Sequence, residues 1–140
     1  MAYKIFLDTN ILIDLLDDER LHHTNAIRLI NEAENGNCTV YVTESVLNTT
    51  AYLVRKDYPT QKLIPLFNHL LSFVEVIPVN TITYQMGLHK AVNDIEDAIL
   101  YAAALAENLN YFITNDLKDL RKLEVQKLPV LQAKDFIKLI

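Results

Sequence analysis

The chain has 140 residues, of which 51% are hydrophobic and 22% charged, and this balance predicts one globular domain spanning residues 1–140. Its two glycines exclude glycine-rich phosphate-binding loops, and its net charge of −5 argues against a general polyanion-binding protein. No apolar run reaches the roughly 20 residues of a membrane span. Together with a single cysteine, Cys38, and no visible secretory signal, this predicts a cytoplasmic protein without a membrane segment.

Strands and helices are predicted to alternate along the chain. Short runs of β-branched and aromatic residues predict strands, and apolar residues at helical spacing predict helices. In chain order, we expect a strand at 5–7, helices at 11–16 and 25–33, a strand at 39–42, helices at 46–54 and 61–71, a strand at 73–77, helices at 80–92 and 94–108, a strand at 111–114, a short helix at 117–123, an edge strand at 129–131 and a helix at 133–140. This order predicts a three-layer α/β/α sandwich with a central parallel sheet of four to five strands.

Two helices carry particular expectations. Thr9 and Asn10 are predicted to cap the first helix. Pro65 predicts that the helix at 61–71 either starts late or kinks. We expect a single chain to bury most of that helix's apolar side chains, which are Leu63, Ile64, Leu66, Phe67, Leu70 and Leu71.

Four acidic residues are predicted to lie at one edge of the sheet. Asp8 ends the first strand, and Glu44 and Asp116 each follow a strand by two residues. Asp97 is in the first turn of the helix that leads into the fourth strand, and right-handed crossovers place the start of that helix at the same edge. The carboxyl edge of a parallel sheet is where such folds bind ligands.

Four carboxylates in one crevice repel one another, so a counter-charge is expected there. Oxygen ligands with no nearby Cys or His suit a hard cation, Mg²⁺ or Mn²⁺. Such an ion can activate water and stabilise a leaving oxygen, so phosphodiester hydrolysis is the natural reaction.

Each acid also has a purely structural interpretation. Asp8 and Asp116 could cap the helices that follow them, and Glu44 could be a favourable charge at a helix N-terminus. Asp94 is expected to cap its helix, with Asp97 as the acid of the third helical position. A structural role explains any single acid well, but it explains poorly why four acids lie at the same edge of the sheet.

Two other acids near these positions are expected to be solvated. Glu96 lies about 100° around the helix from Asp97, whereas Asp94 lies about 60° from it and could face the same crevice. Asp119 follows Asp116 by one turn and could act on the site through water, although a solvated helix face is the stronger expectation for it.

The ordered set of these segments resembles the PIN domain, and in particular the VapC-type toxins of bacterial and archaeal toxin–antitoxin modules. The resemblance covers essentially the whole chain. It rests on Asp8-Thr9-Asn10, Glu44, Asp94-Ile95-Glu96-Asp97-Ala98-Ile99 and Phe112-Ile113-Thr114-Asn115-Asp116. It implies a Mg²⁺- or Mn²⁺-dependent endoribonuclease acting on single-stranded or structured RNA.

The resemblance also implies roles for individual residues and partners. The acidic quartet that it implies for catalysis and metal binding is Asp8, Glu44, Asp97 and Asp116. The residues expected to support this quartet are Asn10, Thr114, Asn115 and Asp94, and the basic residue best placed to contact RNA is Lys118. A protein antitoxin and a homodimer are the implied partners.

Three other functions compete with a toxin nuclease. An RNA-processing PIN nuclease outside a toxin module, and a non-catalytic RNA-binding or interaction module, would have the same fold. Phosphoryl transfer through an aspartyl phosphate is disfavoured, because the haloacid-dehalogenase pattern requires an acid where this chain has Asn10.

Overall fold

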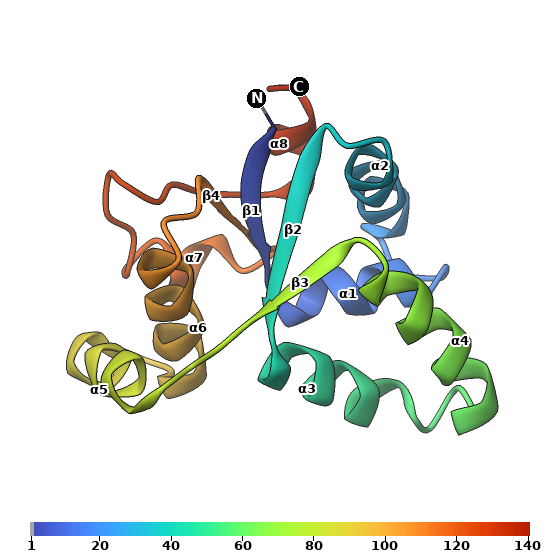
Figure 1. Ribbon diagram of the computed structural model, residues 1–140, viewed down its shortest axis with the longest axis horizontal. Helices are drawn as coiled ribbons and strands as arrows, with labels where there is room; N and C mark the ends of the chain where they lie inside the picture. Colours follow the sequence, from blue (N-terminus) through green and yellow to red (C-terminus); the bar gives the residue numbers. More distant parts are fainter. Residues whose placement is uncertain (1) are drawn as a thin grey trace.

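The computed structural model describes residues 2–140 and has a five-stranded parallel sheet with strand order β3-β2-β1-β4-β5 (Figure 1). The strands are β1 (Tyr3–Leu7), β2 (Cys38–Thr43), β3 (Val74–Ile77), β4 (Tyr111–Ile113) and β5 (Val130–Leu131). The predicted α/β/α fold with a parallel sheet is therefore confirmed, including the edge strand β5.

Helices cover both faces of the sheet. They are α1 (Thr9–Leu16), α2 (His23–Glu34), α3 (Glu44–Val54), α4 (Thr60–Leu71), α5 (Thr81–Lys90), α6 (Ile95–Ala106), α7 (Leu117–Leu120) and α8 (Ala133–Ile137). Figure 1 shows α1 to α4 on one side of the sheet and α5, α6 and α7 on the other. Right-handed crossovers require this division, because the chain moves outward from β1 to β3 and then crosses back to β4.

The central strand β1 is buried on both faces, as its apolar run predicted. Ile5, Phe6 and Leu7 are fully buried, and the Phe6 ring stacks on Phe112 of β4 with 5.0 Å between ring centroids. Cys38 of β2 is a buried free thiol in the same core.

The register of the strands places Asp8, Thr43 and Thr114 next to one another at the carboxyl ends of β1, β2 and β4. Leu7 pairs with Ile113, and Phe6 pairs with Tyr41, so Asp8 and the residues that close β2 and β4 leave the sheet together. The backbone N–H of Asp8 donates to the Ile113 carbonyl at 3.0 Å. Because the chain leaves β1 toward β2 and returns on its other side as β4, this edge is the topological switch point of the sheet.

Two local predictions were wrong. Asp8, rather than Thr9 or Asn10, is the N-cap of α1, because its extended backbone lets its side chain accept a hydrogen bond from the Thr9 N–H. Helix α4 begins at Thr60 and continues through Pro65, so of the two outcomes expected at this proline the late start is wrong. Pro65 lies on an exposed face of this helix, where water can satisfy the carbonyl that the missing N–H leaves free.

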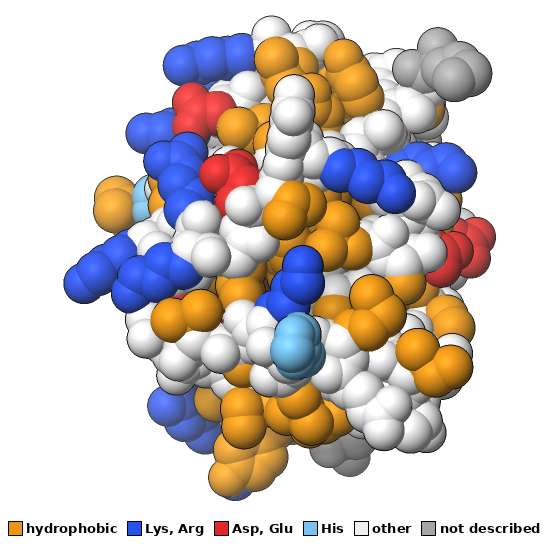
Figure 2. Space-filling model, turned by 90° about the vertical axis from the view of Figure 1, so that its left-hand side faces the viewer, with side chains coloured by type: hydrophobic (Ala, Val, Ile, Leu, Met, Phe, Trp, Pro, Cys, Tyr) orange, Lys and Arg blue, Asp and Glu red, His pale blue; other side chains and the backbone are white. Residues whose placement is uncertain are grey.

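Helix α4 is also less covered than expected. Leu63 and Leu70 are buried, but Ile64, Leu66 and Leu71 are 43–55% exposed. Figure 2 shows further exposed hydrophobic side chains on the face formed by α5, α6 and the segment after α7. No helix among residues 2–140 has the length and apolar composition that crossing a membrane requires.

Candidate metal centre

Asp8 is held rigidly at the end of β1. Its carboxylate is 5% exposed and accepts hydrogen bonds from the Thr9 N–H at 2.8 Å and from the Thr114 hydroxyl at 2.8 Å. Burial raises the pKa of Asp8, the two hydrogen bonds lower it, and the charges of Asp116 and Asp94 raise it further. The net direction is upward, chiefly because the carboxylate is buried, and the neighbouring acids add to the rise.

Three other carboxylates converge beside it. Asp97, Asp116 and Asp119 can each place one oxygen so that all three lie within 4.8 Å of one another. Asp97 comes from the first turn of α6, Asp116 is the N-cap of α7, and Asp119 lies three residues further on. The Asp119 N–H donates to the Asp116 carboxylate at 3.3 Å, so the cap of α7 also fixes the spacing of two acids.

Burial and neighbouring carboxylates also raise the pKa of Asp97. Burial raises its pKa to about 7, and the charges of Asp8, Asp94, Asp116 and Asp119 contribute in that order. A cation placed among these oxygens would remove the repulsion and favour the ionised form of Asp97.

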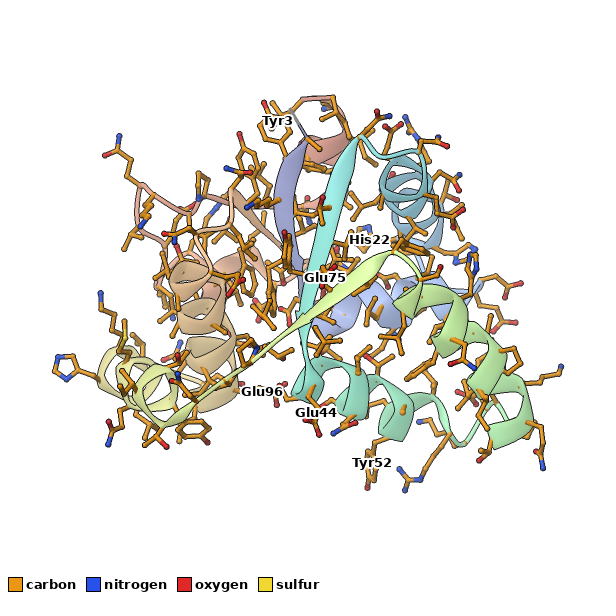
Figure 3. The ribbon with its side chains drawn as sticks, in the orientation of Figure 1. Tyr3, His22, Glu44, Tyr52, Glu75 and Glu96 are labelled. Carbon is orange, nitrogen blue, oxygen red and sulfur yellow. The ribbon has the colours of Figure 1, made fainter. Side chains whose placement is uncertain are left out.

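Glu44 lies at the same sheet edge but outside this group of three. It is the first residue of α3, after the N-cap Thr43, and its carboxylate is exposed and accepts a hydrogen bond from Asn48 at 3.4 Å. It lines a separate hollow of about 490 Å³ that reaches Ile99 of α6. Figure 3 shows Glu44 and Glu96 at the starts of α3 and α6, at the edge where β1 and β2 end.

The polar residues around Asp8 form one hydrogen-bonded network. Thr114 donates to Asp8 and accepts from the Asp116 N–H at 3.0 Å, so one hydroxyl connects two acids. Asn10 donates to Thr114 at 3.2 Å and to Asp8 at 3.4 Å, and its carbonyl oxygen accepts from the Asn115 N–H at 3.1 Å. These bonds join the ends of β1 and β4.

Asp14 extends this network into α1 and was missed by the sequence reasoning. Its side chain is 2% exposed, accepts a hydrogen bond from Asn115, and pairs with the Arg20 guanidinium at 2.6 Å. An acid in the apolar run of α1, one turn after Asn10 and on the same face, is the signal that could have identified it.

The remaining predicted residues lie at the rim. Asp94 caps α6, with its carboxylate accepting from the Asp97 N–H at 3.1 Å. Lys118 is exposed on α7. Glu96 is exposed, yet burial and the charges of Asp94 and Asp8 raise its pKa, so it lies within range of the acidic centre. Asp119, expected in solvent, is instead part of the cluster because its i,i+3 spacing from Asp116 brings both to one face of α7.

These donors fit a hard divalent cation. The cluster offers only carboxylate oxygens and is partly buried, and the Lys122 ammonium, 3.9 Å from the Asp119 carboxylate, balances only one of its three charges. Mg²⁺ and Mn²⁺ prefer such oxygen ligands and usually keep several waters, which a partly open site allows.

Fold and site together define an α/β/α protein with an acidic, oxygen-rich centre at the switch point of a parallel sheet. Residues 4–118 match the family model described as PIN domain. The chain belongs to the PIN domain family.

Relatives with similar sequence and structure have names from the VapC group. Ribonuclease VapC1 of Aquifex aeolicus (strain VF5) is 25% identical over 118 residues, covering 81% of each chain. A chain in the crystal structure of DNA-bound VapBC from Salmonella typhimurium superposes with a TM-score of 0.68 at 16% identity, covering 94% of this chain and 99% of that one. Mycobacterium tuberculosis VapC20, a toxin that cleaves the sarcin–ricin loop, gives 0.63 at 18% identity, covering 77% and 86%. The two structural likenesses extend the fold assignment over most of the chain.

Proposed function

We propose that this protein is a metal-dependent endoribonuclease and the toxin of a type II toxin–antitoxin module, formed by one domain over residues 1–140. The observation that carries the proposal is the convergence of carboxylates at the switch point, with a pKa of about 7 for Asp97. Membership of the PIN domain family supports a nuclease, and the names of the VapC relatives support RNA as the substrate.

The proposed catalytic set is the quartet Asp8, Glu44, Asp97 and Asp116, joined by Asp119. Mg²⁺ or Mn²⁺ would be held by Asp97, Asp116 and Asp119, with Asp8 beside them, and would supply stabilisation of the charge that develops on phosphodiester oxygens. Glu44 begins α3 at the same sheet edge, and its position directly after β2 supports its place in the quartet.

The protein's own residues provide the preorganisation. Thr114 and the Thr9 N–H fix both oxygens of Asp8, so this carboxylate needs no reorientation during the reaction. Asp94 caps the first turn of α6, which carries Asp97, and the bond between Asn10 and Asn115 holds the segment that carries Asp116. Lys118 is placed on α7 to contact an RNA phosphate.

An antitoxin and a second copy of this chain are the proposed partners in a cytoplasmic protein. Several solved neighbours are toxin–antitoxin complexes. The exposed apolar side chains of α4, and of α5 at Ile82, Tyr84 and Leu88, provide surface that a partner would cover.

RNA cleavage assays test the proposal. Purified protein should cleave single-stranded RNA with Mn²⁺ and lose this activity with EDTA or in the variant Asp97→Asn. The control Glu75→Gln removes the same charge from the exposed strand β3, away from the switch point, and should cleave at the wild-type rate. Cleavage that persists in EDTA, or in folded Asp97→Asn, would refute the metal role of the acidic cluster.

A further inference from the structure

A hollow of about 350 Å³ lies between α5, α6 and the segment that follows α7. Ala98 and Ala102 of α6, Met86 of α5 and Leu123 of the following segment provide apolar walls. Its volume lies within the range of small-ligand pockets, so it can accommodate a planar ring system.

This hollow shares a wall with the acidic centre. Leu123 also lines a small depression of about 10 Å³ together with Asp97 and Asp119. Lys122, at the rim of the larger hollow, places its ammonium nitrogen 3.9 Å from the Asp119 carboxylate. A polymer chain bound with one of its units at the carboxylates would therefore have the next unit at the hollow.

The surface around the hollow is basic although the whole chain is acidic. Residues 117–127, which form α7 and the segment after it, contain four Lys or Arg and two Asp or Glu, a net charge of +2, whereas the chain has −5. Figure 2 shows this face with hydrophobic side chains in the centre and Lys and Arg on both sides. Lys90 approaches from α5, and within residues 2–140 it makes no salt bridge.

Tyr101 and Glu124, two polar residues that line the hollow, are hydrogen-bonded to backbone groups. The Tyr101 hydroxyl donates to the Leu128 carbonyl at 2.6 Å and accepts from the Val125 N–H at 2.9 Å. Glu124 accepts from the Val130 N–H at 2.6 Å. The hollow therefore offers apolar surface rather than free hydrogen-bonding groups, which suits the face of a ring more than a polar ligand.

We propose that this hollow, the base pocket, takes one unstacked base of the RNA substrate beside the cleaved bond, while Lys90 and Lys122 bind flanking phosphates. The proposal rests on the nuclease function proposed above. Apolar and aromatic surfaces that receive bases, flanked by cations that follow the backbone, are how proteins bind single-stranded RNA. Recognition by shape and stacking tolerates several bases, so the preference at this position should be modest.

Abasic scanning of RNA binding tests the base pocket without requiring cleavage. Fluorescence anisotropy in EDTA would measure binding of a short single-stranded RNA with one abasic nucleotide placed at each position in turn. For the wild type we expect one position at which the missing base weakens binding about tenfold. In Leu105→Trp, which fills the pocket from its partly exposed rim, that position should become insensitive.

Charge reversal tests the rim independently. Lys90→Glu should weaken binding of all RNA sequences. It should also reduce the slope of log K against log salt concentration by about one for each phosphate contact that is lost. The matched control Lys62→Glu, on exposed α4, changes the same charge and should retain both the wild-type salt dependence and the abasic profile.

Three results would overturn the base pocket. These are a flat abasic profile in the wild type, an unchanged sensitive position in folded Leu105→Trp, or equal effects of Lys90→Glu and Lys62→Glu. A change in oligomeric mass of Leu105→Trp by light scattering would instead assign the hollow to a protein interface. Because binding is measured without metal, these outcomes are independent of whether the protein cleaves RNA.

Discussion

Replacing Asp97 with Asn should stabilise the metal-free protein while abolishing cleavage. Burial and four neighbouring acids raise the pKa of Asp97 from 3.8 to about 7 in the folded state. The folded protein therefore binds this proton more tightly than the unfolded chain does. The resulting stabilisation is fully present below pH 3.8 and is lost as the pH rises through about 7.

The size of this stabilisation follows from the difference between the pKa of Asp97 in the unfolded chain and in the folded protein. From 3.8 to about 7, at about 1.36 kcal/mol per pH unit, the loss would be about 4 kcal/mol for a fully buried group. Asp97 is partly exposed, and solvent screening reduces this loss to about 2 kcal/mol. The neutral Asn side chain does not carry this penalty, so Asp97→Asn should be about 2 kcal/mol more stable than the wild type above pH 7.

Urea unfolding in EDTA measures this difference. The advantage of Asp97→Asn should be largest near pH 8 and should shrink as the pH falls toward about 5, where the wild-type carboxyl is protonated. The control Glu75→Gln should follow the wild type at each pH. Added Mn²⁺ should stabilise the wild type and have a much smaller effect on Asp97→Asn. Parallel pH profiles of the wild type and Asp97→Asn would refute the electrostatic reasoning.

Three further substitutions test the support of the site and the fold. Arg20→Ala leaves the buried carboxylate of Asp14 without its ion partner and should lower the free energy of unfolding by about 2 kcal/mol or more in urea titrations; a loss under 0.5 kcal/mol would contradict that buried pair. Gly87→Ala would place a Cβ 2.6 Å from Ile99 Cδ1 and 2.9 Å from Ile99 Cα, so thermal unfolding should show a loss of about 1–3 kcal/mol, and unchanged stability would mean that α5 and α6 can separate without cost. Thr114→Val removes the hydroxyl that connects two acids and should weaken Mn²⁺ binding by about tenfold in calorimetry, whereas wild-type affinity would show that this hydroxyl does not position them.

Much of the fold could be predicted from local patterns. The fully apolar run Ile5-Phe6-Leu7 predicted a central strand, and the alternation of strands with helices predicted a parallel sheet whose carboxyl edge carries the site. These features depend on periodicity and chain connectivity, which are properties of the sequence.

The membership of the acidic cluster was decided by the tertiary structure. Asp119, expected in solvent, lies with Asp97 and Asp116, whereas Glu44 lies apart from them at the same edge. The pairing of Asp14 with Arg20, and the exposure of Ile64, Leu66 and Leu71 on α4, likewise depend on how separate helices pack. Parallel strand direction and the crossover connections determine which end of the sheet an acid occupies. Whether carboxylate oxygens share one cation depends on differences of a few ångströms in side-chain position, which only the packed structure determines.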